Sequence, residues 1–309
     1  MLLFEEYNEH IEYENNLQLF EGGRAFKDLS NFTAKNSNEI KEEVIKLMED
    51  KFGLNSNQWA IVGSFNNKSG NTKINDIDII VKIDAISTIN INHPKDIDRV
   101  LTNIQNKLKK IKIRSRKFSI IGVVSGRLKI RKNRYIQVDI IPVSNLNWGT
   151  FIYHAPRPTE SKYKGLYRNA LIEAVAKSIH FNKVKYEIDQ RYFKKNDINS
   201  YTRYRMIKNF GLWSVVEKNK GIRKFKYEKI QNTYNFISNN PKRIISILLG
   251  VDDLNNIKTF ESVWKIVSSK NFKHNKVFSD IIKNFKIIIK DRLRMDVPNV
   301  VTDAEKSLN

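Results

Sequence analysis

The first long pattern of apolar and polar positions predicts a helix over residues 38–52. Its apolar residues recur every three or four positions, at Ile40, Val44, Leu47, Met48 and Phe52. This spacing puts them on one helix face, and Gly53 follows as a stop. The same pattern predicts a second helix over residues 95–111, and residues 1–20 resemble an acidic, partly amphipathic helix.

Short apolar runs between these helices predict strands. Residues 59–62, 76–83 and 135–143 are rich in Ile and Val, and residues 118–125 and 128–130 form two weaker runs with a turn expected at Gly126-Arg127. Strands that alternate with helices indicate a small mixed β-sheet flanked by helices, so we expect an α+β fold.

Two aspartates alternate with isoleucines at the start of the 76–83 strand. In an extended chain Asp76 and Asp78 project to one face, and Ile77 and Ile79 project to the other. Carboxylates held side by side repel each other unless a cation lies between them, and Mg²⁺ prefers such oxygen ligands. The pattern therefore predicts a metal site.

A third aspartate lies in the strand predicted over residues 135–143. Asp139 is the one acidic residue in this otherwise apolar, β-branched run. Burial of a carboxylate is costly without a metal, a cation or strong hydrogen bonds. We therefore expect Asp139 to have such a partner.

The pattern changes after Pro156 and Pro158, where helical spacing replaces strands. The helices expected beyond this point cover residues 167–181, 227–237, 241–249, 259–267 and 276–293. We expect an acidic segment over 1–37 that packs on the core, an α/β domain over 38–150 and an all-helical domain over 151–309.

Composition narrows the functional classes. The chain of 309 residues has no cysteine, which excludes disulfides and thiolate zinc sites and fits a reducing intracellular compartment. We expect a soluble cytoplasmic protein without membrane contact, because no apolar run approaches the roughly 20 residues that span a bilayer.

The net charge is +22, although residues 1–60 are net acidic. This excess favours a polyanionic partner such as nucleic acid, although a codon bias toward Asn, Lys and Ile would also produce it.

Three features follow one another along the chain. The first is the turn Val62-Gly63-Ser64, the second is Asp76-Ile77-Asp78-Ile79 after a polar spacer, and the third is Asp139 on a later strand. This combination resembles the DNA polymerase β-like nucleotidyltransferase superfamily, which includes poly(A) polymerases, CCA-adding enzymes and oligoadenylate synthetases. The resemblance covers about residues 38–180. It implies a nucleotidyltransferase palm over 38–150, followed by a helical domain that binds the nucleotide and substrate.

The resemblance also implies roles for the aspartates. Asp76 and Asp78 would bind two Mg²⁺ or Mn²⁺ ions, and Asp139 would complete the site and accept the proton of the acceptor hydroxyl. Gly63, Ser64 and the amides of their turn would hold the phosphates of an NTP, with ATP favoured by the resemblance. The reaction would transfer a nucleoside monophosphate and release pyrophosphate.

Basic residues supply candidate contacts to the triphosphate. Lys68, or alternatively Lys73, follows the Gly-Ser turn, and relatives place further ligands at the entry to the second domain, where Lys164, Arg168 and Lys177 lie. A solvated basic helix start is the alternative interpretation of these three. The tyrosines nearby, Tyr163 and Tyr167, either stack on the base or pack in the core.

Several questions stay open at this point. Residues 65–70 lack the Arg-Gly-Thr type of sequence that many RNA-polymerising members carry, so no subfamily is assigned. The acceptor is expected to be the 3′ end of an RNA, and a protein, small-molecule or nucleotide acceptor and a non-catalytic nucleic-acid-binding relative remain alternatives. The interleaved residues 201–205 (Tyr-Thr-Arg-Tyr-Arg) suit either single-strand binding or a solvated helix face.

Overall fold

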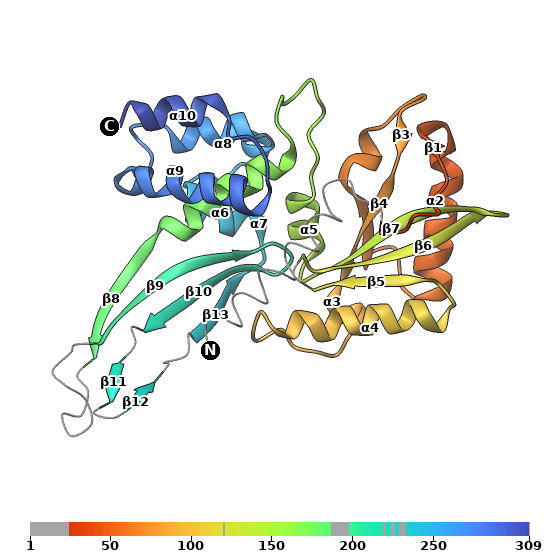
Figure 1. The fold of residues 1–309 in the computed structure, drawn as a ribbon, viewed down its shortest axis with the longest axis horizontal. Helices are drawn as coiled ribbons and strands as arrows, with labels where there is room; N and C mark the ends of the chain where they lie inside the picture. Colours follow the sequence, from red (N-terminus) through yellow and green to blue (C-terminus); the bar gives the residue numbers. More distant parts are fainter. Residues whose placement is uncertain are drawn as a thin grey trace. The chain divides into compact units, whose positions relative to one another are not determined.

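The computed structural model describes residues 25–119, 121–186, 198–218, 221–223, 226–228 and 233–308. The chain divides into two compact units between Ala155 and Pro156 (Figure 1). The helix expected over residues 1–20 lies outside the described residues. Among the described helices, none is both long enough and apolar enough to cross a membrane.

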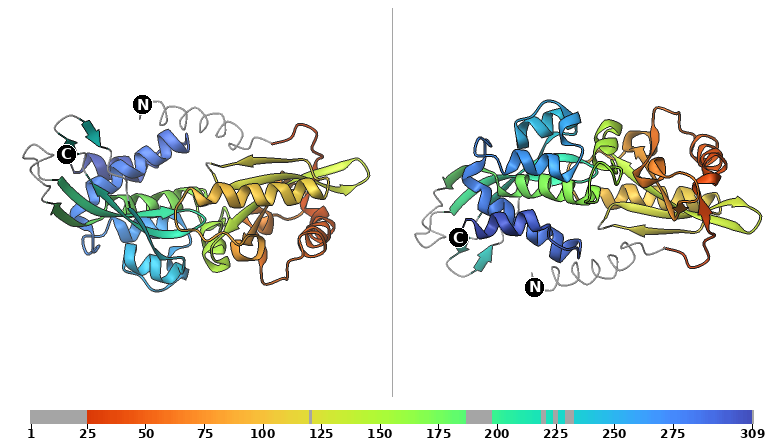
Figure 2. Two further views of the ribbon diagram at one scale, coloured as in Figure 1. Left: turned by 90° about the horizontal axis from the view of Figure 1, so that it is seen from below. Right: turned by 90° about the horizontal axis from the view of Figure 1, so that it is seen from above.

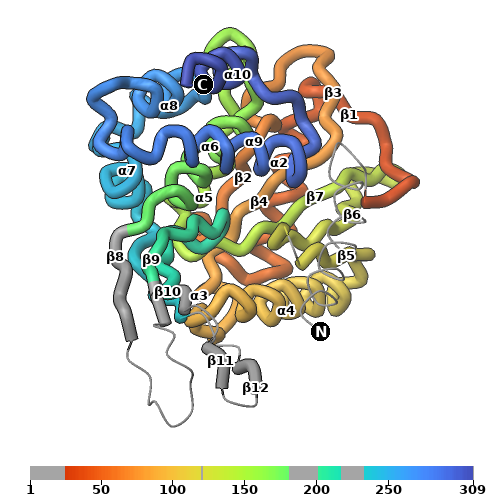
Figure 3. Tube along the Cα trace, turned by 60° about the vertical axis from the view of Figure 1, so that its left-hand side comes forward, coloured from red at the N-terminus to blue at the C-terminus, as the bar shows by residue number. Residues whose placement is uncertain are grey.

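The first unit is built on a five-stranded mixed sheet in the order β2-β4-β7-β6-β5 (Figure 3). Its strands are β2 (Trp59–Val62), β4 (Asp76–Lys82), β5 (Ser115–Phe118), β6 (Val123–Arg131) and β7 (Arg134–Val143). The central pair β4 and β7 is parallel, and the other neighbours are antiparallel. The three strongest strand predictions are confirmed.

Helix α4 (Asp96–Lys110) covers one face of this sheet (Figure 2). Its residues Val100, Leu101, Ile104 and Leu108 are fully buried, as are Ile77 and Ile79 of β4. Before the sheet come a short strand β1 (Phe32–Thr33), which pairs with β3 (Lys73–Ile74), and α2 (Ser37–Ile45), which a π-helical turn continues to Lys51. The helices predicted over 38–52 and 95–111 are thus confirmed.

The opposite face is covered near the ends of β4 and β7 by α5 (Leu146–Ile152), while the short helix α3 (Ile83–Ile86) follows β4. The side chain of Asn145 accepts a hydrogen bond from the Trp148 amide and caps α5. A Cβ at Gly149 would lie 2.9 Å from Ile80 Cδ1. The absence of a side chain at Gly149 therefore lets α5 pack directly on β4.

The turn predicted at Gly126-Arg127 is wrong, because Gly126 lies inside the continuous strand β6. A Cβ at Gly126 would be 3.3 Å from Val138 and 3.5 Å from Leu108. The absence of a side chain at Gly126 lets β6 pack closely against α4. The chain turns instead around Gly122, which has a φ of +69°.

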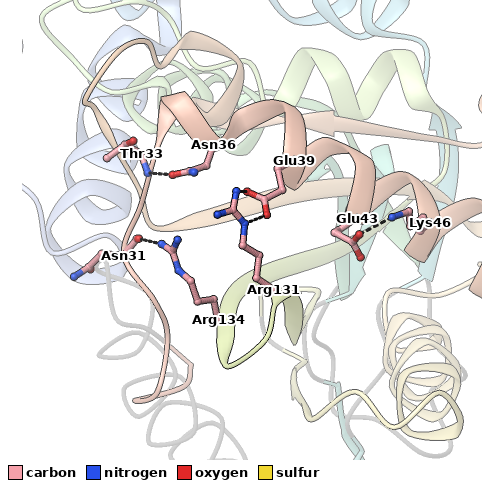
Figure 4. A network of polar contacts seen from close by, with 8 residues as sticks. All are labelled: Asn31, Thr33, Asn36, Glu39, Glu43, Lys46, Arg131 and Arg134. Carbon is pink, nitrogen blue, oxygen red and sulfur yellow. Dashed lines mark hydrogen bonds and ion pairs between the residues drawn. The ribbon is translucent and has the colours of Figure 1, made fainter.

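Polar contacts tie the β6–β7 hairpin to the segment before α2 (Figure 4). Arg131 forms a two-pronged ion pair with Glu39 of α2. Arg134 donates a hydrogen bond of 2.6 Å to the carbonyl of Asn31, and its guanidinium lies 4.2 Å from the ring centroid of Phe32. The hairpin therefore holds the chain where it leads into α2.

The second unit combines helices with a sheet. Its helices are α6 (Gly165–Ser178), α7 (Pro241–Leu249), α8 (Phe260–Val267), α9 (Phe278–Ile287), which a π-helical turn continues to Arg292, and α10 (Asn299–Lys306). The helices predicted over 241–249, 259–267 and 276–293 are confirmed, and the side chain of Asn240 caps α7 by accepting a hydrogen bond from the Arg243 amide.

The expectation of an all-helical second domain is wrong. Four antiparallel strands form a sheet in the order β13-β10-β9-β8, and a small pair β11-β12 lies between β10 and β13 in the chain. The bounds are β8 (His180–Tyr186), β9 (Ile198–Ile207), β10 (Gly211–Lys218), β11 (Gly221–Arg223), β12 (Lys226–Glu228) and β13 (Thr233–Ser238). The predicted helix over 227–237 is therefore β12 and β13, and the one over 167–181 ends at Ser178.

A two-residue alternation in β10 is the signal that the helical interpretation missed. Trp213 and Val215 are buried, whereas Ser214 and Val216, which alternate with them, are half-buried. Residues 201–205 lie in strand β9 and not on a helix. Tertiary pairing of these strands overrides the weak local preference for helix.

Candidate active site

One row of residues crosses the first unit's sheet from strand to strand. Neighbour by neighbour, Val62 pairs with Asp78, Asp78 with Asp139, Asp139 with Ser125, and Ser125 with Arg116. Side chains of paired residues project to the same face of a sheet. Asp78 and Asp139 are therefore side by side on the face opposite α4.

A second row runs parallel to the first, two residues away. It contains Asp76 of β4, Gln137 of β7 and Arg127 of β6. The face is thus acidic on β4 and basic toward β5 and β6. Lys117 confirms the direction of Arg116, because Lys117 projects the opposite way and bonds Asp98 of α4 at 2.8 Å.

Gly63 lies against the carboxylate of Asp78. It has a φ of +74°, and a Cβ built on it would be 2.1 Å from Asp78 Oδ2. Gly63 opens a 3-10 turn that runs to Asn67, and its own N–H donates to the Tyr153 carbonyl at 3.2 Å. Ser64 is exposed in this turn. The amide of Gly63 is thus engaged within the unit, and the side chain of Ser64 stays open to solvent.

Asp139 is only 4% exposed and accepts hydrogen bonds from two side chains. Ser125 Oγ donates to Oδ1 at 2.5 Å, and Gln137 Nε2 lies 3.1 Å from each oxygen. Burial raises the pKa of Asp139 to about 6, with a further rise from Asp76, while the bonds from Ser125 and Gln137 lower it. The expected partner of Asp139 is thus a pair of hydrogen-bond donors.

Asp76, which belongs to the second row, is half-buried. Burial raises the pKa of Asp76, and the nearby ammonium of Lys68 lowers it. Lys68 therefore interacts electrostatically with a carboxylate that the sequence singled out. Lys73 is exposed in β3.

The segment of residues 25–30, which we call the strap, is bound to the basic side of this face. The Ala25 N–H donates to Gln137 Oε1 at 2.8 Å, and Asp28 pairs with Arg127 at 2.6 Å. Ser30 exchanges two hydrogen bonds with the backbone of Tyr135.

The ring of Phe26 is the apolar anchor of the strap. It is 2% exposed and packs with Ala25 and Phe118. The guanidiniums of Arg114 and Arg116 each lie 5.8 Å from its centroid. Together with Arg127, these arginines form what we call the basic half of the face.

Gln137 and Ser125 were missed by sequence reasoning. Gln137 carried a signal, because it stands two residues before Asp139 on one strand and so shares its face. Ser125 carried none, since only the register of β6 against β7 brings it to Asp139.

The donor chemistry of the three aspartates suits a hard divalent cation, because all the ligands would be carboxylate oxygens. In the part of the chain that the structure describes, no three or more His, Cys, Asp or Glu side chains are placed so that they could hold a metal ion. Asp76, Asp78 and Asp139 thus lie on one face of the sheet, but their carboxylates do not point to one common position.

The other predicted nucleotide ligands belong to the second unit. Lys164 is exposed at the start of α6, and Lys177 is half-buried with an ion pair to Glu173 at 3.6 Å. Arg168 is fully buried and donates to the Asn169 side chain at 2.9 Å. Burial lowers the pKa of Arg168 to about 10. Contrary to the prediction, its guanidinium is not open to a triphosphate.

Tyr163 and Tyr167 contact the core of the second unit. Both rings lie against Phe260, at centroid distances of 4.9 and 6.1 Å, and the Tyr167 hydroxyl donates to the Asp296 carbonyl. Of the two interpretations of these tyrosines, the contacts favour packing.

Comparison with known proteins gives little further information. No family model and no curated protein matches the sequence. Among solved structures, a ternary gap complex of Leishmania infantum polymerase beta matches at 12% identity and a TM-score of 0.31, over 55% of this chain and 58% of that chain. A ternary P/T complex of the same polymerase matches at 11% identity and a TM-score of 0.30, over 55% of this chain and 66% of that one.

Each match therefore spans less than two thirds of the polymerase chain. TM-scores this far below 0.5 do not establish a common fold. The function has to be inferred from the site itself.

Proposed function

We propose that this protein is a metal-dependent nucleotidyltransferase that moves a nucleoside monophosphate from an NTP to an acceptor hydroxyl. The observation that carries the proposal is the placement of Asp76, Asp78 and Asp139 on one face of two parallel neighbouring strands. The Gly63 backbone, packed against Asp78, supports it. The carboxylates that the resemblance implies as ligands are thus neighbours.

In this reaction the acceptor oxygen attacks the α-phosphorus of the NTP. A P–O bond forms, the bond to the β-phosphate oxygen breaks, and pyrophosphate leaves with the electron pair. Asp76 and Asp78, with Asp139, would hold the two Mg²⁺ or Mn²⁺ ions, which when bound supply a Lewis acid for the phosphates and the acceptor hydroxyl.

The protein's own groups then have separate tasks. Asp139 would take the proton of the acceptor hydroxyl, which is the role that the resemblance implies for it. Lys68, which interacts with Asp76, would bind a phosphate oxygen. Gly63 allows close backbone approach, and Ser64 offers an exposed hydroxyl beside it.

We assign the acceptor to nucleic acid, with the 3′ end of an RNA first. The basic half of the face supports this assignment, because its arginines Arg114 and Arg116 are exposed and Arg116 belongs to the same row as Asp139. Phosphates of a strand whose terminal hydroxyl reaches Asp139 would meet these cations. Lys164 and Lys177 stay candidates for triphosphate binding on the basis of the resemblance.

The test is incubation with each labelled NTP and Mg²⁺ or Mn²⁺, with and without RNA, followed by sizing of the product. We expect metal-dependent extension of the RNA that Asp76→Ala and Asp139→Ala abolish. Asp84→Ala is the matched control, because Asp84 follows β4 closely but is 73% exposed. Its activity should equal that of the unchanged protein.

The other outcomes separate the alternatives. Label transfer that needs no RNA would favour a protein, small-molecule or nucleotide acceptor. No transfer with any NTP, combined with RNA binding that the aspartate variants leave unchanged, would favour a non-catalytic nucleic-acid-binding protein.

A further inference from the structure

A buried glutamine connects the strap to Asp139. Gln137 is 6% exposed, and both ends of its amide are used: Oε1 accepts from the Ala25 N–H, and Nε2 donates to both oxygens of Asp139. Nothing in the proposed reaction requires a glutamine at this place. Its contacts nevertheless reach the carboxylate on which the reaction depends.

The orientation of this amide is decided by Ala25. A backbone N–H can only donate, so the Gln137 atom that faces it must be the oxygen. The NH₂ group then has to face Asp139. A reversed amide would place its oxygen against the carboxylate, where two acceptors repel.

The hydrogen bonds restrict Asp139 without occupying it fully. A carboxylate offers about four lone-pair sites. Ser125 and Gln137 use two on Oδ1, and Gln137 uses one on Oδ2. The carboxylate plane is thereby fixed, and one site on Oδ2 is left beyond those that the described donors use.

We propose that Gln137 is a positioning residue for Asp139, and that the backbone N–H of Ala25 sets which end of its amide faces the carboxylate. This inference rests on the proposed function, in which Asp139 is a metal ligand. Within the strap, Ala25 is then the residue that acts on Asp139, through its bond to Gln137.

The experiment measures Mn²⁺ affinity by electron paramagnetic resonance, without nucleotide or acceptor, and kcat and KM for transfer. Removal of a group that orients a metal ligand typically costs about 10–100-fold in affinity or activity. We expect Gln137→Met to weaken Mn²⁺ binding and lower kcat by such factors, with KM for the NTP changed less than about threefold. Gln137→Asn, which retains an amide but is too short, should act the same way if the Met variant does not fold.

Ala25→Pro tests the strap, because proline has no N–H to donate. It should reproduce part of the loss seen for Gln137→Met, and the double variant should be no worse than Gln137→Met alone. Lys27→Pro is the control for a proline in the strap at an exposed position. It should leave Mn²⁺ affinity within about twofold.

Three results would overturn the inference. The first is Mn²⁺ affinity in Gln137→Met that equals or exceeds that of the unchanged protein, since Gln137 would then be neutral or a competitor of the metal. The second is a double variant whose losses multiply, which would mean that Ala25 acts independently. The third is no Mn²⁺ binding by the unchanged protein. By contrast, weaker Mn²⁺ binding in Gln137→Met without any nucleotidyl transfer would contradict the proposed function only.

Discussion

The carboxylate of Asp78 occupies the space that a side chain on Gly63 would need. A Cβ at Gly63 would lie 2.1 Å from Asp78 Oδ2, far inside van der Waals contact. The glycine and the aspartate are 15 positions apart in the chain and adjacent in space. The turn and the strand therefore form one unit of the site.

Gly63→Ala should displace Asp78 and impair the site more than it impairs the fold. We expect at least about a 100-fold loss of kcat, as small misplacements of reacting groups can cause, and a cost in stability of about 1–3 kcal/mol from the left-handed backbone. Gly70→Ala is the matched control, because Gly70 has a φ of +58° but no atom within 4 Å of its built Cβ. Equal kcat losses in the two variants would contradict the contact with Asp78.

The contribution of Asp139 to the stability of the metal-free protein should fall as the pH rises from about 4 to 7.5. Its folded-state pKa of about 6 lies above the ordinary value of 3.8, so the folded protein holds the proton more tightly than the unfolded chain. This contribution is complete below pH 4 and is lost as the pH passes 6, to an extent of about 1–3 kcal/mol.

Urea denaturation of the unchanged protein and of Asp139→Asn, each at several pH values, measures this effect. The stability of Asp139→Asn relative to the unchanged protein should increase between pH 4 and 7.5, because the variant has no carboxylate to ionise. A difference that stays constant over this range would show that the carboxyl group does not titrate there.

Arg168→Ala should act on stability and not on NTP binding. The variant would remove a fully buried side chain that donates to Asn169, so we expect a loss of about 2–4 kcal/mol. The KM for the NTP should change less than about twofold. Lys164→Ala, at an exposed position, should leave stability within about 0.5 kcal/mol. A large rise of KM in Arg168→Ala without destabilisation would contradict this expectation and indicate that Arg168 binds the nucleotide.

The basic half should set the salt dependence of RNA binding. Each phosphate contact to a single strand contributes about 0.7 to the slope of log K against log salt concentration. The double variant Arg114→Gln, Arg116→Gln, at two exposed arginines of the basic half, should therefore lower the slope by about 1.4 and weaken binding at low salt. Lys110→Gln is the control, because Lys110 is exposed on α4 over the opposite face. Filter binding of a labelled RNA at several salt concentrations measures both.

The sequence by itself determined the parts of this protein that local patterns encode. Period-two alternation put Asp76 and Asp78 on one face of β4, and the lone acid in an apolar run marked Asp139 as buried. Helical spacing likewise identified α2 and α4, because burial of one face imposes its period on the chain.

Only the tertiary structure decided which distant residues meet. The register of β6 against β7 brings Ser125 to Asp139, and the return of the strap brings Ala25 to Gln137. The strands of the second unit were also not predicted from the sequence. Their stability comes from pairing between distant segments, and their local preference for the β conformation is weak. Local periodicity reports burial and face, whereas register and long-range hydrogen bonds depend on contacts between residues that no local pattern connects.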